Sequence, residues 1–267
     1  MKVEKIVLNE AREVSLTAYL LDTGGEFRNI CKRPAVLILP GGGYKFCSER
    51  EADPVAMPYL KAGYHAFILR YSVGKHSVWP NPLQDYEQAM EMIRTKAEEW
   101  KVFSDKVAVI GFSAGGHLAA AAATMSKNRP NAAILGYPVT GSDVKGCCAT
   151  APDTISCVDK NTCPCFIFAT RTDAVVPVMN SIRFMEALVQ ADISFESHIY
   201  SYGPHGFSTC DTSVQSGDTT ISSRVPNWVS DSIGWLKEVF GDFGNGGMTK
   251  PVCKAHVTDN DGEFLSV

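Results

Sequence analysis

Short apolar runs alternate with amphipathic stretches along most of the chain. The runs are short enough to be buried strands, and they cover residues 35–39, 65–71, 106–110, 132–137, 165–169 and 195–200. Between the second and the third run, apolar residues recur every three or four positions from Leu83 to Trp100, which predicts a helix with one apolar face. Further helices are expected at about 51–62, 114–127, 179–190 and 227–240. The alternation predicts a doubly wound α/β domain with a mostly parallel sheet.

Both ends of the chain depart from this alternation. Two apolar runs near the start, 5–8 and 15–21, have no helical pattern between them, which predicts an antiparallel hairpin at the sheet edge. Residues 241–267 are rich in Gly, Asp and Asn and follow the last predicted helix. We expect a single domain over 1–240 and a C-terminal extension over 241–267, which is either flexible or lies across the surface or across a partner subunit. The sequence therefore leaves open whether the chain forms a homo-oligomer.

Charge and hydropathy exclude several classes of partner. The chain carries 25 Lys and Arg against 29 Asp and Glu, without a basic cluster that could follow a phosphate backbone, so we expect no nucleic-acid partner. Charges at Glu4, Lys5 and Glu10 interrupt the apolar stretch that a signal peptide would need. The apolar run at 118–125 is far shorter than the roughly 20 residues that span a bilayer. We expect a cytoplasmic protein without membrane contact.

Cysteine usage points the same way. Nine cysteines make an odd count, and a chain of 267 residues does not need disulfides to fold, so reduced thiols are expected. Five cysteines lie within residues 147–165, but this segment has neither paired CxxC motifs nor histidine. We therefore expect no metal site.

The strongest chemical signal is a GxSxG motif around Ser113. Gly111-Phe112-Ser113-Ala114-Gly115 follows a predicted strand and precedes an alanine-rich predicted helix. A sharp turn between strand and helix forces the serine into a strained backbone conformation, and small residues two positions before and after it avoid clashes. A chance glycine-rich turn is the alternative, but the flanking strand and helix favour Ser113 as a nucleophile.

A second glycine-rich segment follows the predicted strand at 35–39. Pro40-Gly41-Gly42-Gly43-Tyr44 leaves backbone amides uncovered, and such amides stabilise the oxyanion of acyl transfer together with the amide that follows the nucleophile. The predicted donors are the amides of Gly42, Gly43 and Ala114. A flexible turn is an equal alternative from this motif alone.

A serine nucleophile needs a histidine base, which a carboxylate orients. His205 follows the predicted strand at 195–200 and fits the chain order serine, acid, histidine. Four other histidines fit less well: His198 lies inside that strand, His117 lies on the helix after Ser113, and His65 and His76 precede the serine. The sixth, His256, belongs to the C-terminal extension.

The predicted acid is Asp173, which follows the strand at 165–169 and precedes a predicted helix. Asp143, after the preceding strand, is the alternative, because some members of this kind of fold carry the acid there. Asp192 comes before a strand and would emerge at the opposite end of the sheet. A helix cap or a surface turn is the more frequent role of any single Asp, so the prediction depends on Ser113 and His205.

Several motifs together resemble a known family. PGGGY, GFSAGGHLAA, the TxxDxxVP run and YGPHGF are similar to those of the intracellular acetyl xylan esterase and bifunctional feruloyl/acetyl esterase group of α/β-hydrolases, over about residues 15–240. The resemblance implies the α/β-hydrolase fold, a Ser113, Asp173 and His205 triad, and small O-acyl esters such as acetylated sugars as substrates. It requires no cofactor. Tyr44, in the PGGGY motif, is expected to bind substrate.

Three functions compete on this sequence. An esterase for short acyl groups is favoured, because residues 140–162 contain no aromatic residue, Leu or Met from which an apolar lid for long chains could be built. A peptidase or amidase could use the same three residues. A binding protein that has lost catalysis is disfavoured, because Ser113, Asp173 and His205 are all present.

Overall fold

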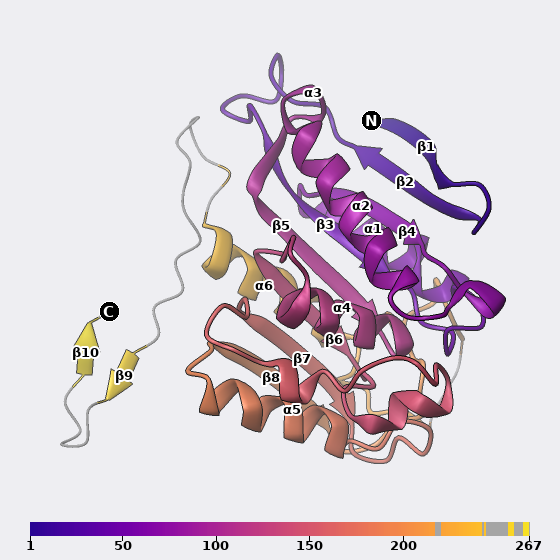
Figure 1. The fold of residues 1–267 in the computed structure, drawn as a ribbon. Coiled ribbons are helices and arrows are strands. Elements are labelled where there is room, and N and C mark those ends of the chain that lie inside the picture. Colours follow the sequence, from indigo (N-terminus) through magenta and orange to yellow (C-terminus); the bar gives the residue numbers. More distant parts are fainter. Residues whose placement is uncertain (217–219, 242, 244–255, 259–263, 267) are drawn as a thin grey trace.

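A sheet of eight strands forms the centre of the molecule (Figure 1). The computed structural model describes residues 1–216, 220–241, 243, 256–258 and 264–266. The strands of the sheet are β1 (Lys2–Asn9), β2 (Val14–Leu20), β3 (Arg33–Leu39), β4 (His65–Arg70), β5 (Val102–Phe112), β6 (Ala132–Gly136), β7 (Cys165–Thr170) and β8 (Phe195–Tyr200). Their order is β1-β2-β4-β3-β5-β6-β7-β8. Strands β4 to β8 and β3 run parallel, whereas β2 is antiparallel to both of its neighbours. The predicted parallel sheet with an N-terminal edge hairpin is confirmed.

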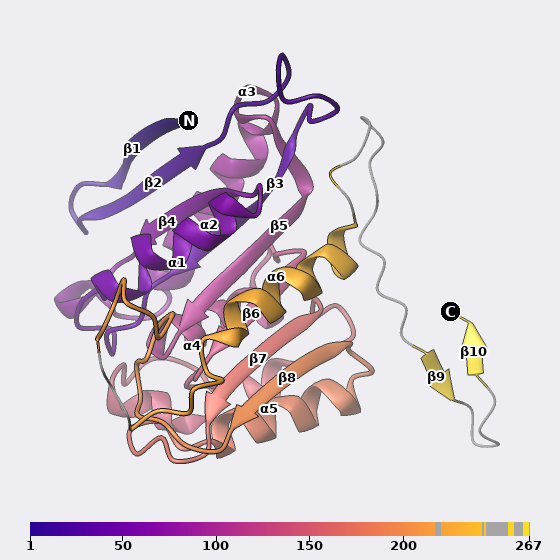
Figure 2. The ribbon, with the colours of Figure 1, turned by 180° about the vertical axis from the view of Figure 1, so that it is seen from behind.

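Helices cover both faces of this sheet. They are α1 (Asp53–Lys61), α2 (Asn81–Thr95), α3 (Ala97–Trp100), α4 (Ala114–Met125), α5 (Met179–Gln190) and α6 (Asn227–Phe240). Four of them, α2, α3, α4 and α5, pack on one face, while α1 and α6 pack on the other (Figures 1 and 2). Successive side chains of a strand point to opposite faces of the sheet. Leu37 and Leu39 of β3 therefore pack in the core under α2, α3, α4 and α5, whereas Val36 and Ile38 pack in the core under α1 and α6. Because both faces are buried, the strands read as continuous apolar runs.

Two predicted helices are divided in the structure. The helix expected at 83–100 is interrupted at Lys96, after which α3 brings Trp100 against Phe67, with ring centroids 5.4 Å apart. The helix expected at 51–62 is a short 3-10 turn, η1 (Glu49–Glu51), followed by α1. Ala52 between them has φ −109° and ψ −104°, which is outside the helical region. This break leaves Glu51 buried rather than on the exposed face of a helix.

The long connections carry further short elements. The 3-10 turn η2 (Gly74–His76) precedes α2, and η3 (Ser142–Gly146) and η4 (Ile155–Cys157) lie between β6 and β7. The expected C-terminal extension over 241–267 lies for the most part outside the described residues; within it, β9 (His256–Thr258) and β10 (Phe264–Ser266) pair antiparallel. None of the helices in the described ranges has the length and apolar character that crossing a bilayer requires.

Two glycines at the turn from β5 into α4 have no room for a side chain. A Cβ at Gly111 would lie 2.1 Å from the carbonyl oxygen of Gly115, and a Cβ at Gly115 would lie 2.2 Å from the carbonyl oxygen of Leu39. Both contacts are with backbone, which cannot move aside without shifting a strand or a helix. The central strands β3 and β5 and the start of α4 therefore depend on glycine at these positions.

We expect Gly115→Ala to lower the free energy of unfolding by at least about 1–3 kcal/mol, the usual cost of overpacking a core. Gly234→Ala in α6 is the matched control, because a Cβ there would meet no atom within 4 Å. Alanine favours a helix over glycine by about 0.5–1 kcal/mol, so the control should be more stable than the wild type. Urea denaturation of the three proteins measures both effects. An unchanged unfolding free energy in Gly115→Ala would contradict the close approach.

Candidate active site

Ser113 occupies the turn between β5 and α4. Its φ of 54° and ψ of −116° are unfavourable for a residue with a side chain. The turn is held because the Ser113 amide donates to the carbonyl of Gly136 at the end of β6 (3.0 Å). Ala114, directly after Ser113, is the first residue of α4. The strained turn thus presents the serine hydroxyl at the carboxyl end of the sheet, beside the N-terminus of a helix.

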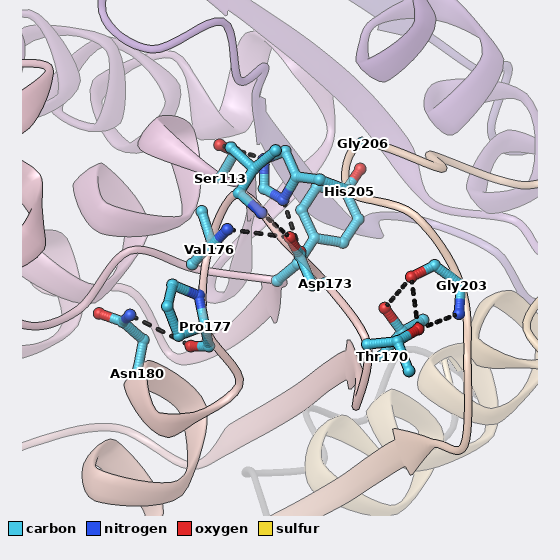
Figure 3. A network of polar contacts seen from close by, with 12 residues as sticks. Ser113, Thr170, Asp173, Val176, Pro177, Asn180, Gly203, His205 and Gly206 are labelled. Carbon is cyan, nitrogen blue, oxygen red and sulfur yellow. Dashed lines mark hydrogen bonds and ion pairs between the residues drawn. The ribbon is translucent and has the colours of Figure 1, made fainter.

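Ser113, His205 and Asp173 are brought together by hydrogen bonds (Figure 3). His205 Nδ1 lies 2.6 Å from Asp173 Oδ2, and His205 Nε2 lies 2.8 Å from Ser113 Oγ. The carboxylate can only accept, so Nδ1 of His205 carries the proton and Nε2 is free to accept from the serine hydroxyl. This arrangement suits a base that removes the serine proton while a carboxylate stabilises the resulting imidazolium.

The Asp173 carboxylate is almost fully buried, with 1% of its side chain exposed. Its second oxygen, Oδ1, accepts hydrogen bonds from the amides of Val175 (2.8 Å) and Val176 (2.9 Å) (Figure 3). Burial of an unpaired charge would be costly, and these two amides together with His205 satisfy it. They also fix the side chain, so that Oδ2 faces the imidazole.

Threonine side chains join the segment before Asp173 to the segment before His205. The hydroxyl of Thr170 donates to the carbonyl of Gly203 (2.9 Å), and the hydroxyl of Thr172 accepts from the amide of Gly203 (3.0 Å) (Figure 3). The ring of Tyr137 packs edge-on against His205, with centroids 5.0 Å apart. The acid and the histidine are therefore held by their loops as well as by each other.

We call residues 40–48, which follow β3, the oxyanion loop, because Gly42 and Gly43 within it are two of the three predicted oxyanion donors. Gly42 and Gly43 line a cavity of about 250 Å³ together with Ser113 and His205. Gly42 has a φ of 125° and Gly43 a φ of 62°, which glycine adopts readily. Among the hydrogen bonds of the described residues, none occupies the amides of Gly42, Gly43 or Ala114. These donors are available to an oxygen of a bound substrate.

The structure does not bring the Tyr44 side chain to this cavity. Tyr44 is 1% exposed, and its hydroxyl contacts His117 Nδ1 at 2.7 Å. Because His117 Nε2 must donate to the carbonyl of Pro152 (2.9 Å), Nδ1 accepts from the tyrosine. Burial lowers the pKa of His117 to about 4 and keeps it neutral at neutral pH. The expectation that Tyr44 contacts the substrate does not fit this placement, and Tyr44 anchors the oxyanion loop in the core instead.

The other candidates considered for the base and the acid lie elsewhere. Asp143 accepts a hydrogen bond from the side-chain amide of Asn180 (2.9 Å). His198 Nε2 contacts Glu196 Oε1 at 2.9 Å. His65 accepts from the backbone amide of Leu21 through Nδ1, at 3.0 Å. Each of these groups is occupied by a local partner, away from Ser113.

Several residues of the cavity were not anticipated from the sequence. Phe46 and Val175 line it with 58% and 71% of their surface exposed, Arg50 lies at its wall, and the carboxyl of Glu51 is buried beside it. Among the described residues, no group of three His, Cys, Asp or Glu side chains is arranged as metal ligands would be. Phe46 lies two residues after Tyr44 in a loop, where no periodic pattern indicates which side chain faces outward.

The cysteine-rich segment after β6 folds without an amphipathic helix. Apolar side chains of this segment, such as Val144, Cys148 and Ala151, are buried in the core, and polar contacts hold it as well, such as those of the Thr154 amide and hydroxyl with the carbonyl of Thr140 (both 2.9 Å). Each cysteine in the described part of the chain is a free thiol, and those of Cys148, Cys163 and Cys165 are buried. The segment therefore presents no broad apolar surface above the cavity.

The chain is similar to a known protein family and to a solved structure. The BD-FAE family matches residues 28–137. The crystal structure of MGS-M1, an alpha/beta hydrolase enzyme from a Medee basin deep-sea metagenome library, is 44% identical, with a TM-score of 0.83 over 89% of this chain and 97% of that chain. Nearly the whole of that protein therefore corresponds to most of this chain.

Two curated proteins match 70% of the chain each. The endo-1,4-beta-xylanase B of Butyrivibrio fibrisolvens is 32% identical over 217 residues, and the acetylxylan esterase of Xylanibacter ruminicola is 31% identical over 216 residues. The match covers 34% and 45% of these two proteins, so the chain spans less than half of their length.

We expect Asp173→Asn to lower kcat on the order of 10⁴-fold, as loss of the orienting carboxylate does in known serine hydrolases. The amide keeps the shape of the side chain but can stabilise the wrong imidazole tautomer and cannot stabilise the imidazolium. Asp143→Asn is the matched control and should keep nearly the wild-type kcat. Steady-state hydrolysis of nitrophenyl acetate by the three proteins makes the comparison. If Asp143→Asn were the slower variant, the acid would belong to the loop after β6.

Proposed function

The chain belongs to the α/β-hydrolases, and on that premise we propose that it is an esterase that removes short acyl groups, above all acetyl, from the hydroxyl groups of small sugars. The observation that carries this proposal is the unbroken contact from Asp173 through His205 to Ser113 beside a small cavity. Two unoccupied amides of the oxyanion loop line the same cavity. The contacts of the proposed nucleophile, base and acid, together with two of the proposed oxyanion donors at the same cavity, support this proposal.

In the acylation step, His205 Nε2 takes the proton of Ser113 as Oγ forms a bond to the ester carbonyl carbon. The carbonyl oxygen becomes an oxyanion and accepts hydrogen bonds from the amides of Gly42, Gly43 and Ala114. Removing one such donor costs about 10²–10³-fold in kcat in other enzymes, so these amides supply a large share of the rate. The bond to the alcohol oxygen then breaks, and His205 returns its proton to that oxygen.

Deacylation repeats these steps with water. His205 takes a proton from water as the oxygen of that water attacks the acyl-enzyme carbonyl, and the same three amides stabilise the second oxyanion. The bond to Ser113 Oγ breaks, Oγ regains a proton from His205, and the carboxylic acid leaves. Asp173 stabilises the imidazolium in both halves of the reaction. These residues need no metal or organic cofactor.

The size and the lining of the cavity support a short acyl group. A volume of about 250 Å³ has to hold the acyl group and part of the alcohol. The apolar residues of the segment from Thr140 to Thr162, such as Val144, Cys148 and Ala151, are buried in the core, and no residue of the segment lines the cavity, so it contributes no apolar cover for a longer chain. The exposed ring of Phe46 can pack against the C–H face of a sugar at the mouth of the cavity. The Xylanibacter ruminicola relative, named an acetylxylan esterase, supports acetylated xylo-oligosaccharides as the sugar esters to test first.

We expect kcat/KM to fall steadily from acetyl to butyryl to octanoyl nitrophenyl esters, because the longer chains cannot be buried. Acetate should be released from acetylated xylo-oligosaccharides with a comparable or higher kcat/KM. Spectrophotometric assays measure the first series, and quantification of free acetate measures the second. An aminoacyl-proline amide, included as an amide substrate, should be left intact.

Two outcomes would contradict different parts of this proposal. A preference for octanoate would contradict the argument from the cavity and from the segment 140–162. Cleavage of aryl acetates without release of acetate from any sugar would exclude the carbohydrate substrate and leave the serine esterase.

A further inference from the structure

The carboxyl group of Glu51 connects two parts of the site that are far apart in the sequence. Glu51 is 3% exposed; its Oε2 accepts a hydrogen bond from the amide of Gly41 (2.7 Å), and its Oε1 accepts one from the hydroxyl of Tyr137 (2.6 Å). Gly41 directly precedes the two glycines whose amides line the cavity. Glu51 therefore fixes the peptide that leads into the proposed oxyanion donors.

Tyr137 extends the contact to the other side of the cavity. Its hydroxyl also accepts a hydrogen bond from the amide of Ser208 (3.0 Å), three residues after His205. The carbonyl of Ser208 in turn accepts from the indole nitrogen of Trp228 (2.9 Å). We call residues 201–210 the His205 loop. Glu51 and Tyr137 thus join the oxyanion loop to the His205 loop through three consecutive hydrogen bonds, from Gly41 to Glu51, from Tyr137 to Glu51 and from Ser208 to Tyr137.

A second connection runs parallel to the first. The guanidinium of Arg50 donates to the carbonyl of Gly206 (2.9 Å), and the hydroxyl of Ser208 donates to the carbonyl of Arg50. Both Arg50 and Glu51 belong to η1, and the break at Ala52 separates this turn from α1. The short turn η1 therefore contacts both loops: Glu51 binds the oxyanion loop at Gly41, and Arg50 binds the His205 loop at Gly206 and Ser208. The helix α1 packs separately on the sheet.

We propose that Glu51 and Tyr137 are positioning residues, which hold the amides of the oxyanion loop and the imidazole of His205 at a fixed separation around the substrate carbonyl. The inference rests on the proposed function, because it assigns these two residues a part in stabilising the same transition state. Neither side chain needs to contact the substrate: Tyr137 acts through Ser208 and through its ring against His205, and Glu51 acts through Gly41.

The free-energy cost of burying the Glu51 carboxyl group favours a role for it beyond stabilising the fold. Burying a carboxyl group is unfavourable, and here burial raises the pKa of Glu51, while the hydrogen bonds from Tyr137 and Gly41 lower it. Apolar side chains would fill the same space without this cost. What a carboxyl offers is two acceptors in fixed directions, and both of them hold groups of the site.

The test compares Tyr137→Phe and Glu51→Gln with the wild type and with Tyr59→Phe. Tyr137→Phe removes the hydroxyl that joins the loops and leaves the contact of Glu51 with Gly41. Glu51→Gln keeps the size of the side chain but presents an amide donor to one of its two partners. Tyr59 is the matched control, because it is a fully buried tyrosine of α1 whose hydroxyl contacts Ser232 Oγ (2.7 Å), outside the cavity.

We expect both site variants to lower kcat for nitrophenyl acetate by about tenfold or more, with KM within a few-fold of the wild type. Misplacing reacting groups by roughly 1 Å can cost about 10²-fold in other enzymes, which sets the scale of the effect. Tyr59→Phe should lose thermal stability to a similar extent as Tyr137→Phe and keep its kcat. The rate at which a fluorophosphonate modifies each protein should fall in parallel with kcat, since that reaction forms a similar charged oxygen.

The results separate this inference from the proposed function. Loss of kcat in the two site variants, without loss in Tyr59→Phe, supports the positioning role. A kcat within twofold of the wild type in both site variants, or an equal loss in Tyr59→Phe, overturns it. A wild type that hydrolyses no ester overturns the proposed function, and the relative fluorophosphonate rates then still decide whether Glu51 and Tyr137 position the site.

Discussion

The close approach of β3 and α4 across the turn at Ser113 is the constraint on which the site depends. Gly115 in the first turn of α4 lies so near the end of β3 that a Cβ there would be 2.2 Å from the carbonyl oxygen of Leu39 and 2.5 Å from that of Pro40. The start of α4 carries Ser113 and the amide of Ala114, and the end of β3 leads into Gly42 and Gly43. One backbone contact therefore places the proposed nucleophile next to all three proposed oxyanion donors. The strained φ and ψ of Ser113 are stabilised by the packing of the two central strands around it.

The remaining parts of the site come from the strands on the other side of β5 from β3. Asp173 and His205 follow β7 and β8, and they face Ser113 because parallel strands bring their carboxyl ends to one edge. Their loops are joined through Thr170, Thr172 and Gly203, and Tyr137 at the end of β6 lies between the two halves. The side chains of Glu51, Ser113 and His205 at the cavity thus have hydrogen-bond partners before any substrate arrives. Such preorganisation is what transition-state stabilisation requires.

The sequence alone predicts the strands, the edge hairpin and the elbow around Ser113, because each depends on a local pattern: apolar runs, glycine spacing and the order of residues along the chain. It does not predict the contact between Glu51 and Tyr137, which lie 86 positions apart and meet only when the sheet is assembled. Glu51 also begins a stretch that reads as one helix, although Asp53 and Pro54 in the first turn of α1 are a local signal for a helix that begins after Ala52. The place of Tyr44 could not be predicted for a similar reason, since its left-handed φ of 59° belongs to a turn that buries its side chain against His117.

The proposed mechanism requires that Ser113 is the residue that becomes acylated. The direct measurement is to treat the wild type and Ser113→Ala with a fluorophosphonate, determine the intact mass, and map the modified peptide by mass spectrometry. We predict one phosphonyl group per wild-type chain, on Ser113, and none on Ser113→Ala. Stoichiometric modification of Ser113→Ala, or modification of the wild type at another residue, would contradict the central claim.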